Sequence, residues 1–214
     1  MWHEILRIIS GEYGGRSIKA PAGRNTRPTA QMAREALFGI IAGRVPGAVF
    51  LDLFSGSGAV GIEAMSRGAS AAVFADSDQA CCRIAQENLA GLCPERKPNA
   101  AVVRADAMDA RALRRKIALG MRLVGAGEIG IAFADPPYAL KGIERLPGII
   151  ASLGAFSDDG VIVVEHSRQT SLPDSAAADS GPGAGSADGA RARAFAKFDV
   201  RCYGQAAFTF YRRA

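Results

Sequence analysis

The chain has few of the residues that usually bind metal ions. Its 214 residues include four cysteines and two histidines, His3 and His166, and no group of them has the spacing of a metal site. Cys81 and Cys82 are adjacent on a segment with helical periodicity, which is not a chelating pattern. The sequence therefore predicts no metal centre, and its cysteines are typical of the reduced thiols of cytoplasmic proteins.

Long hydrophobic runs are also missing. No apolar stretch approaches the roughly 20 residues that a membrane-spanning helix needs. Residues 1–4 lack the basic and then apolar layout of a secretion signal. Hydrophobic residues nevertheless make up 49% of the chain, enough for a sizeable core. We expect a cytoplasmic protein without membrane contact, built as one α/β domain with a small extension.

A strand, a glycine-rich turn and a helix follow one another between residues 49 and 68. The apolar run 49–53 predicts a buried strand, and its one carboxylate is Asp52. Gly56, Gly58 and Gly61 then fit the spacing G-x-G-x-x-G, which close packing of a helix on a strand explains about as well as ligand binding. Asp52 favours a cationic ligand such as S-adenosyl-L-methionine over a dinucleotide, because a carboxylate attracts ammonium and sulfonium groups and repels a pyrophosphate.

Two further acidic residues follow predicted strands. The run 71–75 ends at Asp76, a position from which an acid commonly binds a ribose in such folds, with a helix cap as the alternative. Asp106 follows the run 101–104 and fits a ligand contact and a helix cap equally well.

Apolar runs alternate with helical periodicities along most of the chain. The strands are predicted at 49–53, 71–75, 101–104, 129–134 and 161–165, with a closing antiparallel pair at 195–202 and 207–211. Near the N-terminus, the runs 5–9 and 16–19 flank a glycine-rich turn and predict a β-hairpin. The fold class is therefore α/β, with a mostly parallel sheet of about seven strands, a terminal antiparallel hairpin and a small N-terminal β-hairpin extension.

The most specific pattern is the run Asp135-Pro136-Pro137-Tyr138 at the end of the predicted strand 129–134. Two prolines remove two N–H donors, so the carbonyls and the Asp135 carboxylate are expected to accept hydrogen bonds from a planar exocyclic amine. Tyr138 offers a ring on which an extruded base can stack. These four residues are the predicted catalytic residues.

The sequence resembles the bacterial 16S ribosomal RNA guanine-N2 methyltransferases, a family of class I enzymes that depend on S-adenosyl-L-methionine. The resemblance covers nearly the whole chain, and segment 173–190 departs from it by being longer and richer in Ser, Gly and Ala. The motifs that carry it are Arg7-Ile8-Ile9-Ser10-Gly11 with Gly14-Gly15-Arg16, Arg27-Pro28-Thr29, Arg34-Glu35-Ala36-Leu37-Phe38, Leu51 to Gly61, and Asp135 to Tyr138.

The resemblance implies a Rossmann-like methyltransferase domain at 29–214, with residues 1–28 as the basic extension. Segment 173–190 lacks apolar periodicity and is rich in Ala, Ser, Gly and Asp, which predicts a flexible loop. It also implies that Asp52 and the glycine loop hold the methionine part of the cofactor, that Asp76 binds the ribose, and that Asp106 and Ala107 lie near the adenine. The predicted cofactor contacts are Asp52, Phe54, Ser55, Gly56, Ser57, Gly58, Asp76, Asp106 and Ala107, although the residue type of Phe54 favours the core.

Positive charge is concentrated at the two ends of the chain. Residues 1–44 contain seven Lys or Arg against three acids, and residues 191–214 contain six against one, in a chain whose net charge is +5. Solvated surface charge explains this distribution as readily as a basic footprint for nucleic acid. With the resemblance, we expect RNA contacts from a hairpin that is not needed for folding. The predicted contacts are Arg7, Arg16, Lys19, Arg24 and Arg27.

The predicted function is methyl transfer to the N2 amine of a guanine in 16S ribosomal RNA. The partner is naked ribosomal RNA or a small-subunit particle, and the enzyme is expected to be a monomer. Asp-Pro-Pro-Tyr also serves the N6 amine of adenine, so a DNA adenine methyltransferase is the alternative, although a chain of 214 residues shows no obvious target-recognition domain. A non-catalytic nucleotide-binding module is the third reading, which the intact Asp135–Tyr138 run disfavours.

Overall fold

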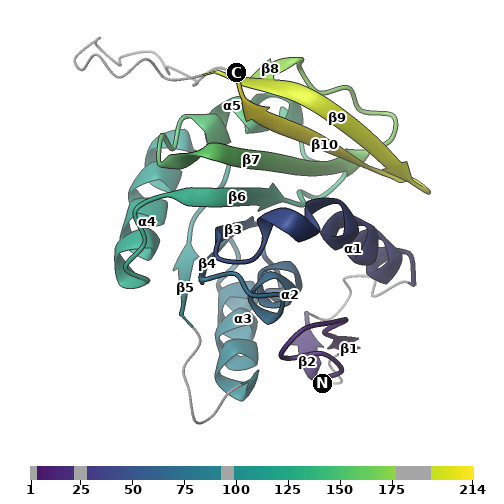
Figure 1. Ribbon diagram of the computed structural model, residues 1–214, viewed down its shortest axis with the longest axis vertical. Helices are drawn as coiled ribbons and strands as arrows, with labels where there is room; N and C mark the ends of the chain where they lie inside the picture. Colours follow the sequence, from purple (N-terminus) through teal and green to yellow (C-terminus); the bar gives the residue numbers. More distant parts are fainter. Residues whose placement is uncertain (1–3, 22–27, 93–98, 177–193) are drawn as a thin grey trace.

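The fold is an eight-stranded sheet between two layers of helices. In the computed structural model, the residues described are 4–21, 28–92, 99–176 and 194–214. Five parallel strands form one half of the sheet: β3 (Val49–Leu53), β4 (Ala71–Asp76), β5 (Ala100–Arg104), β6 (Ile129–Ala134) and β7 (Phe156–Ser167). Antiparallel strands complete it: β8 (Ser175–Ala176), β9 (Phe195–Tyr203) and β10 (Ala206–Arg213). The strand order is β5-β4-β3-β6-β7-β10-β9-β8 (Figure 1).

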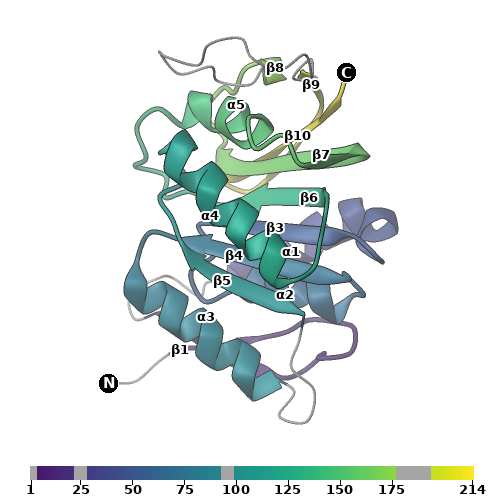
Figure 2. The ribbon, with the colours of Figure 1, turned by 90° about the vertical axis from the view of Figure 1, so that its left-hand side faces the viewer.

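Helices cover both faces of the sheet and bury its alternating side chains. One face carries α1 (Pro28–Ile41), α2 (Ala59–Ser66) and α3 (Gln79–Leu92), with the short turn η1 (Ala42–Arg44) after α1. The other carries α4 (Ala110–Leu123) and α5 (Leu146–Ala151), preceded by η2 (Ile143–Arg145), and Figure 2 shows α4 lying across it. None of the helices in the described ranges is long and apolar enough to cross a membrane.

The N-terminal β-hairpin is fastened to α2 and α3. It consists of β1 (Glu4–Arg7) and β2 (Ser17–Ala20), paired antiparallel. The Glu63 side chain of α2 is fully buried and accepts hydrogen bonds from the backbone N–H groups of Ile9 (2.7 Å) and Ser10 (3.0 Å). Asn88 of α3 accepts from the Lys19 N–H (2.8 Å) and donates to the Lys19 carbonyl (2.9 Å). These buried contacts make the hairpin part of the packed structure, which argues against the expectation that folding does not need it.

The hairpin turn also comes unusually close to α2. Gly11 has φ +84°, and a Cβ atom there would lie 1.8 Å from the Ser66 carbonyl oxygen. Only glycine permits both this backbone conformation and this approach. The side chains of Ile8, Tyr13 and Ile18 consequently reach the same core cluster as α1 and α2.

The structure confirms the predicted fold class and changes some details. The sheet has eight strands where the sequence predicts about seven, because residues 175–176 pair with β9 as the two-residue strand β8. Those two residues therefore do not belong to a flexible loop, and the rest of 173–190 from residue 177 lies outside the described residues, as do Arg24 and Arg27. Strand β7 begins at Phe156, five residues before the predicted start, because the polar residues 157–160 precede the apolar run without ending the strand, although the register with β6 shifts there.

Candidate functional site

Three carboxylates lie near the carboxyl ends of neighbouring parallel strands, on one face of the sheet. Side chains alternate between the faces of a strand, so Asp52 shares its face with Phe50, Asp135 with Phe133, and Glu165 with Val163. Those three apolar neighbours all belong to the core cluster under α1 and α2. The β6–β7 register pairs Ala134 with Val164, which brings Asp135 and Glu165 to the same level. The sheet geometry thus gathers acids that lie far apart in the sequence.

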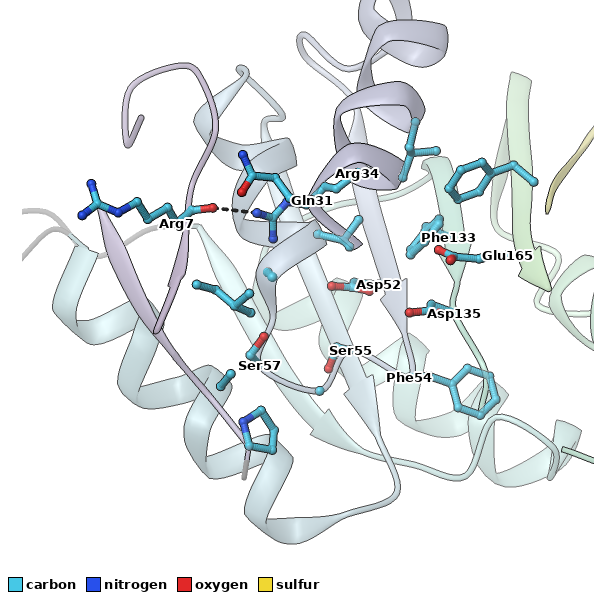
Figure 3. Close-up of a pocket in the computed structure, with 18 of the residues that line it drawn as sticks. Arg7, Gln31, Arg34, Asp52, Phe54, Ser55, Ser57, Phe133, Asp135 and Glu165 are labelled. Carbon is cyan, nitrogen blue, oxygen red and sulfur yellow. Dashed lines mark hydrogen bonds between the residues drawn. The ribbon is translucent and has the colours of Figure 1, made fainter. Parts of the chain in front are cut away.

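The three carboxylates line a cavity of about 440 Å³ between the sheet edge, α1 and the hairpin. Figure 3 shows Asp52, Asp135 and Glu165 close together on one side of the cavity and the Arg34 guanidinium on the other, while the Arg7 side chain points away from the cavity. This position is the carboxyl edge of the parallel strands, where α/β proteins bind their ligands. The cavity therefore has an acidic wall and a basic wall.

The turn after β3 has a backbone conformation that few residues adopt. Phe54 is the one described non-glycine residue with positive φ (58°), and it is followed by Gly56 (φ 53°) and Gly58 (φ 79°). A bulky residue held in this region usually stores strain at a functional site. The Ser55 hydroxyl is buried on the cavity wall and has no hydrogen-bond partner among the described residues. This unpaired polar atom indicates that the turn is shaped for a ligand.

Asp76 holds the glycine turn from below. Its carboxylate is buried and accepts hydrogen bonds from the N–H groups of Gly56 (2.8 Å) and Asp78 (2.9 Å). Gly61 donates its N–H to Asp52 (2.9 Å), and a Cβ there would lie 2.3 Å from the Phe74 ring. The third glycine of the motif therefore serves close helix–strand packing, whereas the first allows the turn to be tied to Asp76.

Burial raises the pKa of two carboxyl groups on the acidic wall of the cavity. Desolvation raises the pKa of Asp52 to about 7, opposed by the Gly61 hydrogen bond and helped by the charges of Asp135 and Asp76. Desolvation also raises the pKa of Glu165 to about 8, and the charge of Asp135 adds to the shift. Neither Asp52 nor Glu165 has an ion-pair partner among the described residues. A ligand that brings positive charge or hydrogen-bond donors would stabilise both ionised groups.

The basic wall comes from α1. Arg34 is only 8% exposed, and its Nη2 donates to the Arg7 carbonyl (2.6 Å). Its buried Nε has no hydrogen-bond partner among the residues described. Gln31, Arg34 and Leu37 are spaced three residues apart and all line the cavity. This spacing was available in the sequence, but no role was predicted for Gln31 or Arg34.

The Asp135–Tyr138 segment leaves β6 at the mouth of the cavity. Asp135 is an exposed residue on the cavity rim, and Tyr138 is 61% exposed. The Pro137 carbonyl accepts a hydrogen bond from the Leu140 N–H (2.8 Å), which occupies one of its two lone pairs. The Asp135 carboxylate and the Pro136 carbonyl are further acceptors that this segment can present to a substrate amine.

The predicted cofactor residues are only partly brought together. Asp52, Phe54, Ser55, Gly56 and Ser57 line the cavity. Gly58, Asp76, Asp106 and Ala107 do not, and Asp106 accepts a hydrogen bond from the Met108 N–H (2.8 Å) next to α4. Asp76 and Asp106 thus already have backbone partners, so a ligand role for either is additional to a structural one.

The predicted RNA contacts that lie within the described residues are Arg7, Arg16 and Lys19, and all three are exposed. Lys19 pairs with Glu87 (2.8 Å). The Arg16 guanidinium donates to the Leu92 carbonyl and lies 6.0 Å from the centre of the Tyr13 ring. His166 is buried and hydrogen-bonded to Thr209 (2.7 Å).

Comparisons with known proteins identify close relatives. The model of a family described as Conserved hypothetical protein 95 matches residues 6–179. The chain is 40% identical to "Putative rRNA methyltransferase YlbH" of Bacillus subtilis over 169 residues, which are 79% of this chain and 86% of the relative. It is 33% identical to "Ribosomal RNA small subunit methyltransferase D" of Escherichia coli over 168 residues, 78% of each chain. The structure of "Putative methyltransferase yhhF" from Escherichia coli matches with a TM-score of 0.68 at 27% identity, over 98% of both chains.

Proposed function

The chain belongs to the family described as Conserved hypothetical protein 95, and from this premise we propose that it is a methyltransferase of small-subunit ribosomal RNA that uses S-adenosyl-L-methionine. The methyl group goes to the exocyclic N2 amine of a guanine. The observation that carries this proposal is that the carboxylates of Asp52 and Asp135 line one cavity from the neighbouring strands β3 and β6, with Asp135 opening the Asp135–Tyr138 run.

The cavity suits the charges of the cofactor. S-adenosyl-L-methionine supplies an electrophilic methyl group on a sulfonium, and its amino-acid part carries one ammonium and one carboxylate. Asp52 on the acidic wall would hold the ammonium, and Arg34 on the basic wall would hold the carboxylate with its unpaired Nε. The Ser55 hydroxyl and the glycine turn face the same space, and Asp76, Asp106 and Ala107 are the proposed contacts on the adenosine side.

The reaction needs an amine nitrogen whose lone pair is free and correctly aimed. The Asp135 carboxylate and the Pro136 carbonyl accept the two amine hydrogens, which draws the nitrogen from planar towards tetrahedral geometry. Tyr138 stacks on the base and fixes its plane. As the C–N bond formed, the bond between the methyl carbon and the cofactor sulfur would break, and its electron pair would stay on the sulfur. The nitrogen would lose one proton, which Asp135 can hold before it passes to solvent at the exposed mouth. Alignment and electrostatics therefore provide most of the rate.

The substrate approaches along the hairpin side of the cavity. Arg7 contributes to the cavity wall, and Arg16 and Lys19 are exposed on the same hairpin. We expect these cations to contact RNA phosphates, with the protein acting as a monomer on ribosomal RNA or a small-subunit particle in the cytoplasm.

The test uses methyl-labelled cofactor with three substrates: small-subunit particles, naked 16S ribosomal RNA and duplex DNA. Nucleosides from the labelled product are separated and identified by mass. N2-methylguanosine from the RNA is the expected product. N6-methyladenine from the DNA would support the alternative function, and no incorporation into any substrate would contradict a catalytic role.

A further inference from the structure

Glu165 is a half-buried carboxylate that the proposed reaction does not use. Its side chain lines the cavity and has no hydrogen-bond or ion-pair partner among the described residues. It belongs to β7, the neighbour of the strand that carries Asp135, and the paired register places it at the same level as Asp135. Figure 3 shows both side chains on the same side of the cavity.

A carboxylate in this position needs donors from a ligand. The charged groups nearest to it along the cavity wall are the carboxylates of Asp135 and Asp52, and the guanidinium of Arg34 comes from α1 on the opposite wall. Burial and the charge of Asp135 raise its pKa, so the ionised form is unfavourable while the cavity holds no donor. A hydrogen bond from a ligand N–H to the ionised form would reverse this shift.

Guanine offers two donors side by side, N1–H and the N2 amine, on its Watson–Crick edge. Adenine has an acceptor at N1, which an ionised carboxylate repels. We propose that Glu165 accepts the N1–H of the target guanine while Asp135 accepts the neighbouring N2 amine, so that Glu165 selects guanine over adenine. This inference rests on the proposed function and adds to it the residue that sets the base specificity.

The proposal also explains how the site selects between guanine and adenine, which the Asp135–Tyr138 segment alone does not determine. That segment presents acceptors for an exocyclic amine, which both bases possess. A second acceptor beside the ring N1 position distinguishes guanine from adenine. Guanine donates its N1–H to that acceptor, whereas adenine has no hydrogen at N1 and would leave the acceptor unpaired. Of the two strands beside β6, β7 places a carboxylate at the level of Asp135, whereas β3 carries Asp52 two residue pairs earlier in the register.

The test compares two versions of one RNA, with the mapped target guanine or with 2-aminopurine at that position. 2-Aminopurine keeps the N2 amine but has an acceptor at N1 and no O6. The wild-type enzyme should prefer guanine by about ten- to a hundred-fold in single-turnover rate. Glu165→Gln should remove most of that preference, because an amide can donate to N1 of 2-aminopurine as well as accept from guanine. Glu128→Gln, an exposed residue before β6, is the matched control and should keep the preference.

Each outcome bears on Glu165 separately from the proposed function. Equal wild-type rates on the two RNAs would overturn the proposal without any variant. If Glu165→Gln still prefers guanine over 2-aminopurine, recognition of the guanine O6 explains the preference, and the proposal is overturned as well. Weaker cofactor binding by Glu165→Gln in calorimetry, with an unchanged base preference, would place the residue at the cofactor ammonium. Failure of the proposed function itself would appear as no methylation of guanine by the wild type.

Discussion

Asp135 and Glu165 leave neighbouring parallel strands at the same level and line one cavity, and the charge of Asp135 helps to raise the pKa of Glu165 to about 8. Asp52 lies on the next strand, and its pKa is raised to about 7 by burial. Without a ligand, the folded protein is more stable when Asp52 and Glu165 are protonated than when they are ionised. The site is therefore built at some expense of stability, as is common for ligand sites.

The first prediction concerns the pH dependence of stability. A carboxyl whose pKa rises from 3.8 to about 7 on folding stabilises the protein fully below pH 3.8, and the contribution is lost as the pH rises to about 7. Asp52→Asn removes this dependence and keeps an acceptor for the Gly61 N–H. The variant should match the wild type near pH 4 and become more stable towards pH 8, by at most about 1.4 kcal/mol per pH unit. Urea unfolding across this range measures the difference, and parallel curves for the two proteins would contradict it.

The second prediction separates catalysis from cofactor binding. Asp135→Asn should lower the single-turnover rate by about a hundred-fold or more, because the amide holds the amine less well and cannot take its proton. Cofactor affinity in calorimetry should change little, since Asp135 lies at the exposed mouth of the cavity. The exposed Glu144→Gln serves as the control for loss of one surface charge. A near wild-type rate in Asp135→Asn would show that another group accepts the amine.

The third prediction concerns Asp76, which the structure ties to the glycine turn through Gly56 and Asp78. Asp76→Ala leaves two backbone N–H groups without their partner and should cost about 1–3 kcal/mol of stability. Cofactor affinity should fall as well, because the turn loses its support even if Asp76 never touches the ribose. Asp76→Asn keeps one acceptor, so its stability should lie between that of the wild type and that of Asp76→Ala. Unchanged stability with lower affinity would instead favour a direct ribose contact.

The fourth prediction tests whether the hairpin belongs to the folding unit. Glu63 is fully buried and accepts from Ile9, Ser10 and the Arg67 guanidinium (2.7 Å). Glu63→Gln replaces one acceptor with a donor and should cost about 3 kcal/mol, as for other broken buried charge pairs. Amide hydrogen exchange at Ile9 and Ser10 should accelerate. Glu12→Gln, an exposed change on the same hairpin, should alter neither quantity, and continued protection of Ile9 in Glu63→Gln would make the hairpin's docking independent of this contact.

The sequence predicted most of the fold because its signals are local. The run Ile129–Ala134 ends at an acid and two prolines, and the structure gives the strand the same bounds. The two-residue strand β8 could not be predicted, since Ser175 and Ala176 have no pattern of their own and are ordered by pairing with β9. The sequence also does not predict the turn in which the Leu140 N–H donates to the Pro137 carbonyl.

The site was predicted less completely than the fold. Asp52 lies within one recognisable strand and Asp135 follows another, and both line the cavity. Arg34 and Glu165 reach the same cavity from α1 and β7, which lie more than a hundred residues apart in the chain. Their convergence depends on strand order and on the position of α1 over the sheet. Sequence spacing predicts the face of a helix or strand on which each residue lies, but it does not predict which of these faces pack against each other.

The last prediction concerns the basic surface of the hairpin. Arg7 and Lys19 are exposed, and the surface pair between Lys19 and Glu87 is too weak to compete with a phosphate. Arg7→Gln with Lys19→Gln should lower RNA affinity and reduce the salt dependence by about 0.7 to 0.9 log units per log unit of salt for each lost contact. Arg16 is left intact, because its contact with the Leu92 carbonyl makes it part of the hairpin's packing on α3.

The matched control is the double variant Arg115→Gln with Lys116→Gln, which removes the same charge from exposed positions of α4 on the opposite face of the sheet. RNA binding is measured at several salt concentrations, beside a cofactor titration on each preparation. If the hairpin contacts RNA, the hairpin variant should change the salt dependence of RNA affinity and the α4 variant should not. Equal effects of the two variants would mean that RNA responds only to net charge, and the hairpin would then act as a wall of the cavity and not as an RNA-binding element.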